Sequence, residues 1–183
     1  MKNEKYSKPI QNIILDTCIL QYSNKKNIQN ELSEYLQDLI ERKFDLYISE
    51  ISIAELLTNL TRENEDEGAK TISYFKKYTV EQNTLIASAQ LSSIYNKVGI
   101  NNLDISKVDG GHINLSDKII GATAILNGAL ILTANIQDFP NPYFIPVEEH
   151  LLIYRNKHGK SMLYLQLLSP NIMLINKVFN RRK

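Results

Sequence analysis

Apolar residues follow two patterns along the chain, short unbroken runs and longer segments in which they recur with a helical period. The segment Ile10–Leu20 starts as an unbroken apolar run, as expected for a strand that is buried on both faces of a parallel sheet. Shorter runs at Asp45–Ser49 and Ala129–Thr133 predict two further strands. Because helical segments lie between these strands, the pattern predicts an α/β fold with a mostly parallel central sheet.

Segments with a period of about 3.6 residues predict the helices. They cover Ile28–Arg42, Glu50–Leu60, Lys70–Tyr78, Ile86–Val98 and Asp117–Leu126. The glycine in Asn127-Gly128 closes the last of these helices. Two interpretations of Val80–Thr84 stay open, a short strand and an extended linker. Gly99–Leu115 is the clearest loop, since its glycines stand among polar residues.

The C-terminal part of the chain predicts a different arrangement. Prolines punctuate the chain before two apolar segments, Phe144–Tyr154 and Ser161–Leu168, which we expect to pair as a hairpin around Asn156–Lys160. The tail that follows mixes apolar residues with a basic end. We expect residues 1–145 to form the main domain, and residues 146–183 to form an extension that packs on the same domain. A length of 183 residues fits one such domain.

Four acidic residues stand next to apolar segments. Asp16 ends the first strand run, Glu55 lies within a predicted helix, Asp117 opens another helix, and Asp138 follows the last predicted strand. The carboxyl ends of parallel strands meet at one edge of a sheet. Carboxylates that converge there repel each other, by roughly 4 kcal/mol for a pair about 4 Å apart, and require a cation. Oxygen ligands alone suit Mg²⁺ or Mn²⁺, and the three histidines are too dispersed for a zinc site.

Taken singly, these residues also have structural explanations. Asp117 follows Ser116, a good N-cap, and the first turn of a helix favours an acid. Glu55 alone reads as a surface residue of its helix. The hydroxyls of Thr17 and Thr133 either steady a water or phosphate at the site or pack at strand ends. The acidic run at residues 63–67 predicts a solvated turn between helices.

Composition narrows the class of protein without identifying its chemistry. A content of 43% hydrophobic and 22% charged residues is that of a globular protein. The only cysteine, Cys18, excludes an intramolecular disulfide, and its apolar neighbours predict a buried structural thiol in a reducing cytoplasm. No apolar stretch approaches the length of a membrane span, so we expect a cytoplasmic protein without membrane contact. The basic tail Lys177–Lys183 either follows an RNA backbone or acts as a solubilising end.

Four motifs in order resemble those of PIN-domain nucleases. They are Ile14-Leu15-Asp16-Thr17-Cys18, then Ile48-Ser49 with Glu55-Leu56-Leu57, then Asp117-Lys118-Ile119-Ile120-Gly121-Ala122-Thr123-Ala124, and finally Leu132-Thr133-Ala134-Asn135-Ile136-Gln137-Asp138-Phe139. The resemblance covers roughly residues 10–144, and VapC-type toxins of bacterial toxin–antitoxin pairs are the best-known relatives. The long loop before Asp117 and the extension past Phe144 depart from the minimal toxin pattern.

The resemblance implies a three-layer α/β/α sandwich and Mg²⁺- or Mn²⁺-dependent cleavage of RNA. Asp16, Glu55 and Asp117 match the metal-binding acids of the family. The fourth position is open, because Asn135 stands where many members carry Asp and Asp138 follows three residues later. We expect Asp138 to be an outer or second-metal ligand and Asn135 to be a hydrogen-bonding partner of the site.

The same resemblance implies an RNA substrate, an antitoxin protein and a homodimer as partners. The predicted helices Ile28–Arg42 and Ile86–Val98 carry more apolar surface than one sheet face needs, which agrees with a dimer. Two other functions stay open. One is a fold of this type that has lost efficient catalysis and binds RNA or protein, and the other is a DNA-directed or structure-specific nuclease with the same acidic site.

Overall fold

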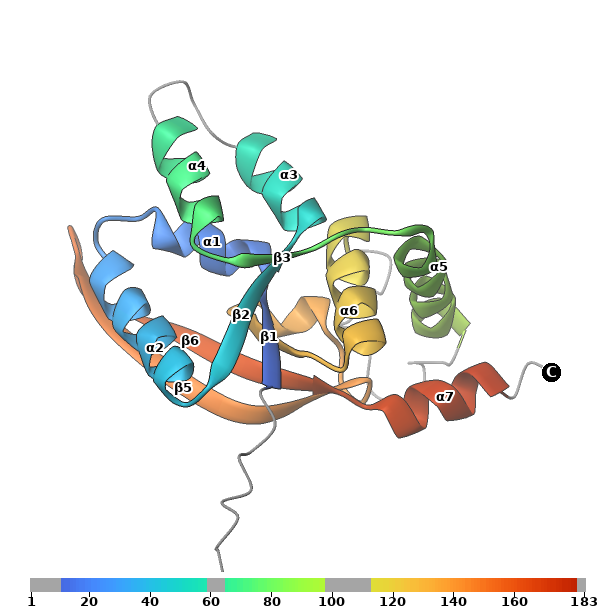
Figure 1. The fold of residues 1–183 in the computed structure, drawn as a ribbon. Helices are drawn as coiled ribbons and strands as arrows, with labels where there is room; N and C mark the ends of the chain where they lie inside the picture. Colours follow the sequence, from blue (N-terminus) through green and yellow to red (C-terminus); the bar gives the residue numbers. More distant parts are fainter. Residues whose placement is uncertain (1–10, 59–64, 98–112, 181–183) are drawn as a thin grey trace, which may run out of the picture.

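The structure is a computed structural model that describes residues 11–58, 65–97 and 113–180, and within them a six-stranded sheet lies between two layers of helices (Figure 1). The strand order is β3-β2-β1-β4-β6-β5. The parallel strands are β1 (Gln11–Leu15), β2 (Phe44–Ser49), β3 (Lys76–Tyr78) and β4 (Leu130–Thr133). β5 (Phe144–Asn156) and β6 (Gly159–Pro170) form an antiparallel hairpin that joins the sheet through β4. The predicted α/β/α sandwich with its C-terminal hairpin is therefore confirmed.

The helices divide between the two faces of the sheet. They are α1 (Thr17–Ser23), α2 (Gln29–Glu41), α3 (Glu50–Thr58), α4 (Glu65–Ser73), α5 (Gln82–Lys97), α6 (Leu115–Asn127) and α7 (Ile172–Asn180). Buried residues of α1 to α4 form one core with the first face, and those of α5, α6 and α7 form a second core on the opposite face.

The central strand β1 explains why its sequence is an unbroken apolar run. Ile13 and Leu15 face the first core, Ile14 faces the second, and all three side chains are fully buried. Burial of each such side chain stabilises the fold by about 1.5–3 kcal/mol. In the parallel register, Leu15 lies beside Leu132 of β4, so the carboxyl ends of both strands reach the same edge.

One helix in the N-terminal half was not predicted and one predicted boundary is wrong. β1 ends at Leu15, directly before Asp16 as predicted, but the apolar residues that follow up to Leu20 belong to helix α1. The helix predicted over Lys70–Tyr78 is α4, which ends at Ser73, and Lys76–Tyr78 is strand β3. Lys76–Tyr78 is a strand because it pairs with β2, where Ser49 and Tyr78 are neighbours in the register.

Other corrections concern helix starts. No strand forms over the described residues 80–84, because α5 begins at Gln82. From Glu65 onward the acidic run is the start of α4, where the helix dipole favours acids; residues 63 and 64 lie outside the described residues. Most of the predicted loop at 99–115 also lies outside them, and its last residue, Leu115, already belongs to α6.

The C-terminal tail contains a helix that the sequence pattern did not predict. In α7, Ile175 is buried in the second core, and the side chain of Asn171 accepts a hydrogen bond from the backbone N–H of Leu174 (3.1 Å). This is the geometry of an N-cap. The basic residues 181–183 lie outside the described residues.

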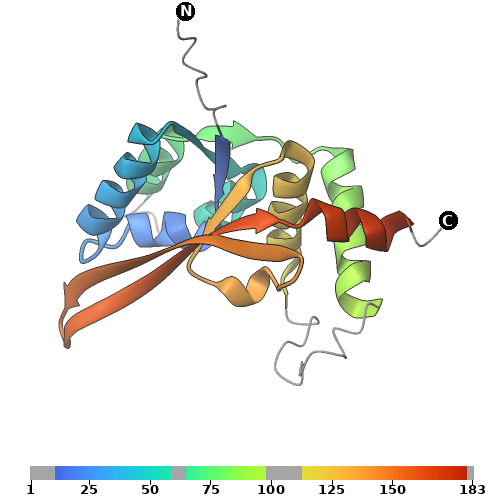
Figure 2. The same cartoon turned by 90° about the horizontal axis from the view of Figure 1, so that it is seen from below.

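The hairpin extends well beyond the sheet it joins, as Figure 2 shows for the long ribbon of β5 and β6. Its inner half is held by α2, since the rings of Tyr35 and His150 stack with their centroids 4.1 Å apart. Arg42 at the end of α2 also donates a hydrogen bond of 2.8 Å to Glu148. None of the helices in the described ranges is both long enough and apolar enough to cross a membrane.

Candidate active site

Asp16 stands at the carboxyl end of β1 and is almost fully buried. Its backbone N–H donates to the carbonyl of Leu132 (3.0 Å), which continues the parallel pairing of β1 with β4. It occupies the N-cap position of α1, yet its carboxylate makes no capping hydrogen bond. Instead, Oδ2 accepts bonds from the hydroxyl of Thr133 (2.6 Å) and the thiol of Cys18 (3.0 Å). The carboxylate is therefore fixed by one side chain from the end of β4 and one from α1.

A short chain of hydrogen bonds orients the hydroxyl of Thr133. The backbone N–H of Asn135 donates to Thr133 Oγ1 (2.8 Å), so this oxygen already accepts one bond while it donates to Asp16. Thr133 is fully buried. The threonine therefore works as a fixed donor to the carboxylate in the described structure, where the sequence had left open a water, a phosphate or plain packing.

Cys18 was predicted to be a buried structural thiol, but it contacts the carboxylate of Asp16. Its side chain is half-buried, and besides donating to Asp16 its sulfur accepts the backbone N–H of Ala134 at 3.4 Å. Burial, together with the negative charge of Asp16, raises the pKa of this thiol far above its usual value. Cys18 is thus a protonated donor at the edge of the site.

Glu55 comes to the same edge from α3. Its Oε2 accepts a hydrogen bond of 2.5 Å from the hydroxyl of Thr17, the first residue of α1. The side chain is half-buried rather than fully exposed. Thr17 and Asp16 are adjacent in the chain, so this hydrogen bond brings the Glu55 carboxylate to the end of β1.

Asp117 lies in the first turn of α6 and is buried. The residue at the N-cap is Asn114, not Ser116, which lies inside the helix. Burial is the largest cause that raises the pKa of Asp117 to about 7, followed by the charges of Asp138, Asp16 and Glu55. The backbone N–H of Asn114 offsets this only in part. Helix capping therefore does not account for the environment of Asp117.

Asp138 ends a short 3-10 helix, η3 (Ile136–Asp138), that follows β4. The amide of Asn135 donates to its Oδ2 at 2.5 Å. Burial first, and then the charges of Asp16 and Glu55, raise the pKa of Asp138 to about 6. Asn135 and Asp138, between which the sequence left the fourth position open, therefore lie in direct contact.

The four carboxylates share one electrostatic environment, although they come from β1, α3, α6 and η3. Each of Asp16, Asp117 and Asp138 has a raised pKa to which another acid of the group contributes. Within residues 11–58, 65–97 and 113–180, no three His, Cys, Asp or Glu side chains already surround one point as metal ligands would.

The donor set fits a hard divalent cation. All four acids offer oxygen, and the raised pKa values of Asp16, Asp117 and Asp138 show that ionising these carboxyls together is costly without positive charge. Mg²⁺ and Mn²⁺ prefer such oxygen ligands. Asp16, Glu55, Asp117 and Asp138 would hold the cation. Thr133 and Cys18 already fix Asp16, Thr17 fixes Glu55, and Asn135 fixes Asp138.

The fold is a three-layer α/β/α sandwich with a mostly parallel sheet. Its candidate site is a group of carboxylates at the carboxyl ends of the parallel strands, which is where ligand sites form in such sheets. The PIN-domain family model matches residues 13–144, which include all four acids. The chain therefore belongs to the PIN-domain family of nucleases. No curated protein sequence matches the chain.

Solved structures share the fold at low sequence identity. VapBC2 from Rickettsia felis, solved with a DNA fragment of its promoter, is 19% identical with a TM-score of 0.54 over 70% of this chain and 91% of that chain. FitAcB from Neisseria gonorrhoeae is 20% identical with a TM-score of 0.53 over 69% and 90%. A toxin–antitoxin complex from Klebsiella pneumoniae is 22% identical with a TM-score of 0.50 over 71% and 92%. These likenesses concern the fold.

Proposed function

We propose that this protein is a divalent-metal-dependent endoribonuclease of the VapC type, and that Asp16, Glu55, Asp117 and Asp138 are its catalytic, metal-binding residues. The observation that carries the proposal is the shared environment of these acids at the carboxyl edge of β1 and β4. The pKa of about 7 for Asp117 reflects both its burial and three neighbouring carboxylates. Membership in a nuclease family and a fold shared with proteins of toxin–antitoxin complexes support it.

The proposed reaction is hydrolysis of a phosphodiester bond in RNA. A Mg²⁺ or Mn²⁺ ion would supply a more acidic water and positive charge against the phosphate. Asp16, held by the hydroxyl of Thr133, would keep the position of the ion fixed. Thr17 would orient Glu55 through the hydrogen bond that it donates. Asn135 would orient Asp138 in the same way.

Cleavage of labelled RNA by purified protein tests this proposal. Asp16→Asn and Asp117→Asn keep the size of each side chain but remove a charge, and we expect each to lower the rate in Mn²⁺ by at least 100-fold. Glu34→Gln, which changes an exposed acid of α2, is the matched control and should cut at the wild-type rate. If both site variants cut RNA as fast as the control does, the proposed site is wrong.

The substrate class is tested in the same assay. RNA, single-stranded DNA and flap DNA should be offered in parallel, because the same acidic site can in principle serve a DNA-directed nuclease. We expect cleavage of RNA alone. Cleavage of DNA at an equal or greater rate would overturn the assignment to RNA, and it would leave the role of the acids intact.

We also propose an antitoxin partner and a homodimer. One of the structures that share the fold, from Klebsiella pneumoniae, is described as a toxin–antitoxin complex, which supports the first. Exposed apolar side chains on the two helices predicted for a dimer, such as Ile40 on α2 and Ile86 on α5, support the second. Light scattering should give a mass of twice the 21.0 kDa of one chain, and the product of a small neighbouring gene should co-purify with the protein. A monomeric mass, or no co-purifying protein, would contradict the respective proposal.

A further inference from the structure

The outer half of the β5–β6 hairpin projects past the edge at which the acids gather. Thr133, the last residue of β4, pairs with Gln166 of β6, and β6 runs antiparallel to β4. The part of the hairpin that runs from the cross-strand pair of Glu149 and Gln166 to the turn therefore lies beyond the carboxyl end of β4 (Figure 2). At roughly 3.3 Å per residue, this segment, which we name the arm (residues 149–166), reaches roughly 23 Å from the sheet edge.

The arm lies outside the part of the chain that defines the family. The family match ends at Phe144, which is the first residue of β5. Whatever the arm does is therefore a property of this chain rather than of the matched PIN domain.

One face of the arm continues the sheet face that carries the site. The side chain of Thr133 contacts Asp16, and its neighbour in the register, Gln166, shares the same face. Side chains alternate along a strand, so this face carries every second residue from there to the turn. We name it the arm face. Its cross-strand pairs are Glu149 with Gln166, which are joined by a side-chain hydrogen bond of 3.1 Å, and then Leu151 with Tyr164, Ile153 with Met162, and Arg155 with Lys160.

The opposite face of the arm belongs to the protein core, because Leu152, Leu163 and Leu165 are buried among residues of the first core. The arm face is exposed instead. Met162 is 68% exposed, Ile153 55% and Tyr164 46%. The arm is therefore a two-stranded ribbon with one face buried in the core and one apolar face exposed to solvent.

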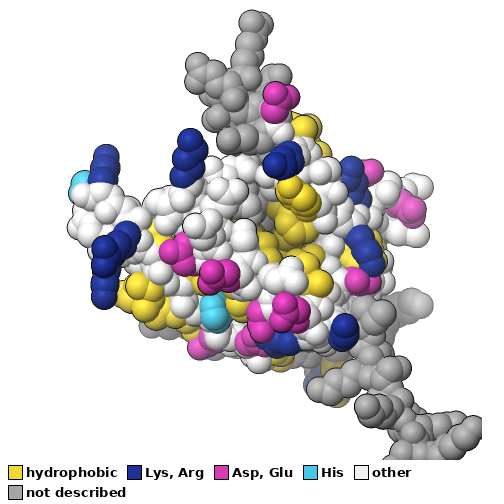
Figure 3. Space-filling view, turned by 60° about the vertical axis from the view of Figure 1, so that its left-hand side comes forward, with side chains coloured by type: hydrophobic (Ala, Val, Ile, Leu, Met, Phe, Trp, Pro, Cys, Tyr) yellow, Lys and Arg dark blue, Asp and Glu magenta, His cyan; other side chains and the backbone are white. Residues whose placement is uncertain are grey.

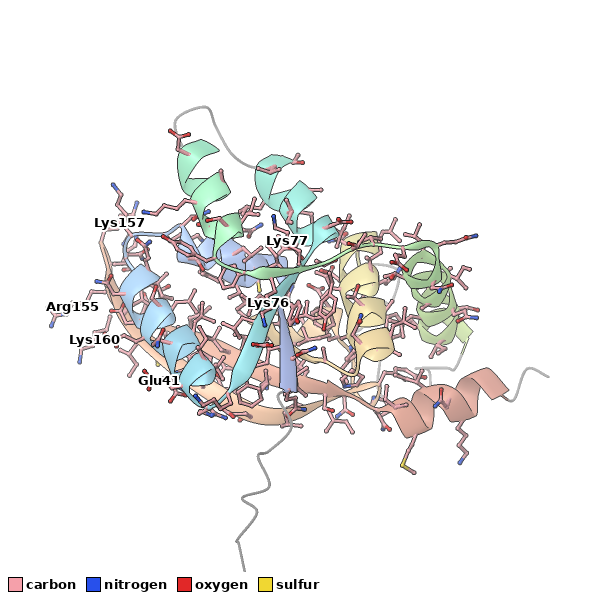
Figure 4. All side chains as sticks on the ribbon, viewed as in Figure 1. Glu41, Lys76, Lys77, Arg155, Lys157 and Lys160 are labelled. Carbon is pink, nitrogen blue, oxygen red and sulfur yellow. The ribbon has the colours of Figure 1, made fainter. Side chains whose placement is uncertain are left out.

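Positive charge is concentrated at the end of the arm. Arg155 and Lys160 face each other directly across the strands, and Lys157 lies in the turn between them. Like charges in directly opposed positions destabilise a hairpin. Among the residues that the structure describes, none of the three makes an ion pair, and no acid occurs between Tyr154 and Ser161. Figure 4 shows all three side chains pointing away from the body of the molecule.

The same concentration is visible in the space-filling view, where Lys and Arg side chains gather at the projecting left-hand end (Figure 3). Glu31 of α2 lines the same surface pocket as Arg155 and Lys160, but among the described residues it forms no ion pair with either of them. The three cations therefore exceed this one acid, and an anion from outside the hairpin would balance them. Next to it, two cross-strand layers of apolar and aromatic side chains lead back toward the acids. Phosphates on cations and bases on apolar and aromatic surfaces are the contacts of single-stranded nucleic acid.

We propose that the arm face binds a single-stranded segment of the RNA that enters the acidic site. The cations Arg155, Lys157 and Lys160 hold its phosphates, and Tyr164 with Met162 supports its bases. This inference rests on the proposed ribonuclease function, and it adds a binding surface remote from the reacting phosphate. It also predicts that the enzyme prefers RNA that is long enough to reach from the acidic site to the cations at the end of the arm.

The test measures binding of a 30-nucleotide single-stranded RNA to protein that carries Asp117→Asn, so its result does not depend on cleavage. Replacing Arg155, Lys157 and Lys160 together by Gln should weaken binding at least 10-fold and lower the slope of log Kd against log salt by about 2, since each phosphate contributes about 0.7. The matched control removes three charges elsewhere, from the exposed Lys43, Lys70 and Lys77, and should leave both values near those of the parent.

A second variant and a second readout separate the arm from the catalytic site. Tyr164→Ala should weaken binding by at least about 5-fold with an unchanged salt slope, because the loss of stacking on one base removes a contact that does not depend on salt. With Asp117 restored, the triple variant should cut a tetranucleotide at the wild-type kcat/KM and the 30-nucleotide RNA at least 10-fold more slowly.

Three results would overturn the proposal. They are equal binding by the triple variant and its control, equal losses on short and long RNA, and a change of oligomeric state with RNA binding intact, which would assign the arm to a protein interface. If wild-type protein cuts no RNA at all, the proposed catalytic function fails, while the binding comparison still decides the role of the arm.

Discussion

At the scale of single residues, the site depends on donors that hold its carboxylates as much as on the carboxylates themselves. Asp16 accepts from Thr133 and Cys18, Glu55 accepts from Thr17, and the amide of Asn135 donates to Asp138. Each donor is a neutral group at a strand end, at the start of a helix or in a loop. Such groups fix a ligand's direction without adding charge to the site.

The hydroxyl of Thr133 is expected to be needed for full activity. Thr133→Val keeps the shape but removes the bond of 2.6 Å to Asp16, and loss of such an orienting partner typically costs 10- to 100-fold in metal affinity or activity. Thr133→Ser retains the hydroxyl and is the matched control. RNA cleavage over a range of Mn²⁺ concentrations measures the effect, and equal half-saturation for the valine and serine variants would rule out this role.

The raised pKa of Asp117 gives a stability that depends on pH. In the folded protein its pKa is about 7, against an ordinary value of 3.8, so the folded state holds this proton more tightly than the unfolded state does. The protonated carboxyl of Asp117 contributes fully to the free energy of unfolding below about pH 4, and this contribution is lost as the pH rises from about 4 to about 7. Without metal, the wild-type protein should therefore melt at a lower temperature at pH 8 than at pH 5.

Asp117→Asn isolates this contribution, because an amide does not titrate. The variant should show a flatter dependence of Tm on pH in metal-free buffer, with the largest gain over wild type at pH 8. The difference amounts to a few kcal/mol of unfolding free energy at most. Parallel curves for the two proteins would show that the carboxyl of Asp117 ionises in the folded state as it does in the unfolded state.

At the scale of elements, the pattern of apolar residues predicted the helices and strands that are buried in the core. The prediction failed where contacts between distant segments determine the secondary structure. Apolar periodicity located α2, α3, α5 and α6, because each buries one stripe. It missed α1, because a helix of seven residues is too short to show a helical period. Nor could it separate β3 from α4, because pairing with β2 makes Lys76–Tyr78 a strand.

The same limit holds for the site. The positions of Asp16 and Asp138 at strand ends could be inferred from the sequence, because parallel strands share a carboxyl edge. The direction of the Glu55 side chain could not, since it depends on how α3 packs against α1. The contact of Cys18 with Asp16 was missed for a related reason, because an apolar neighbourhood in sequence says nothing about which polar group a thiol meets.

Packing between α6 and the start of β5 predicts an effect at Gly121. A Cβ there would lie 3.0 Å from Cζ of the fully buried Phe144 and 3.2 Å from Cδ2 of Leu91. Overpacking costs about 1–3 kcal/mol, whereas Gly→Ala in a helix gains up to about 1 kcal/mol. Gly121→Ala should therefore lower the free energy of unfolding by about 1 kcal/mol, as measured by urea denaturation.

A second background tests the cause. In protein that carries Phe144→Leu, the ring atom nearest the new methyl group is gone, and Gly121→Ala should then be neutral or stabilising. An equal loss in both backgrounds would mean that contact with Phe144 is not the reason for glycine at this position.

At the scale of the whole molecule, one edge of the sheet gathers the proposed chemistry and the proposed recognition. The acids come from β1, α3, α6 and η3, and the arm leaves the sheet beside them through Gln166. Charge is arranged in two zones, since carboxylates gather at the edge and cations gather at the far end of the arm. An RNA strand that lies along the arm face would have its phosphates held at one end and would meet the metal-binding carboxylates at the other.

The central claim is that four carboxylates from separate elements form one divalent-cation site. Calorimetric titration of metal-free protein with Mn²⁺ at pH 8 tests it most directly, with wild type, Asp16→Asn, Asp117→Asn and the control Glu34→Gln measured side by side. Wild type and Glu34→Gln should bind Mn²⁺ with the same affinity, and either site variant should bind at least 10-fold more weakly. Equal Mn²⁺ affinity in all four proteins would contradict the claim.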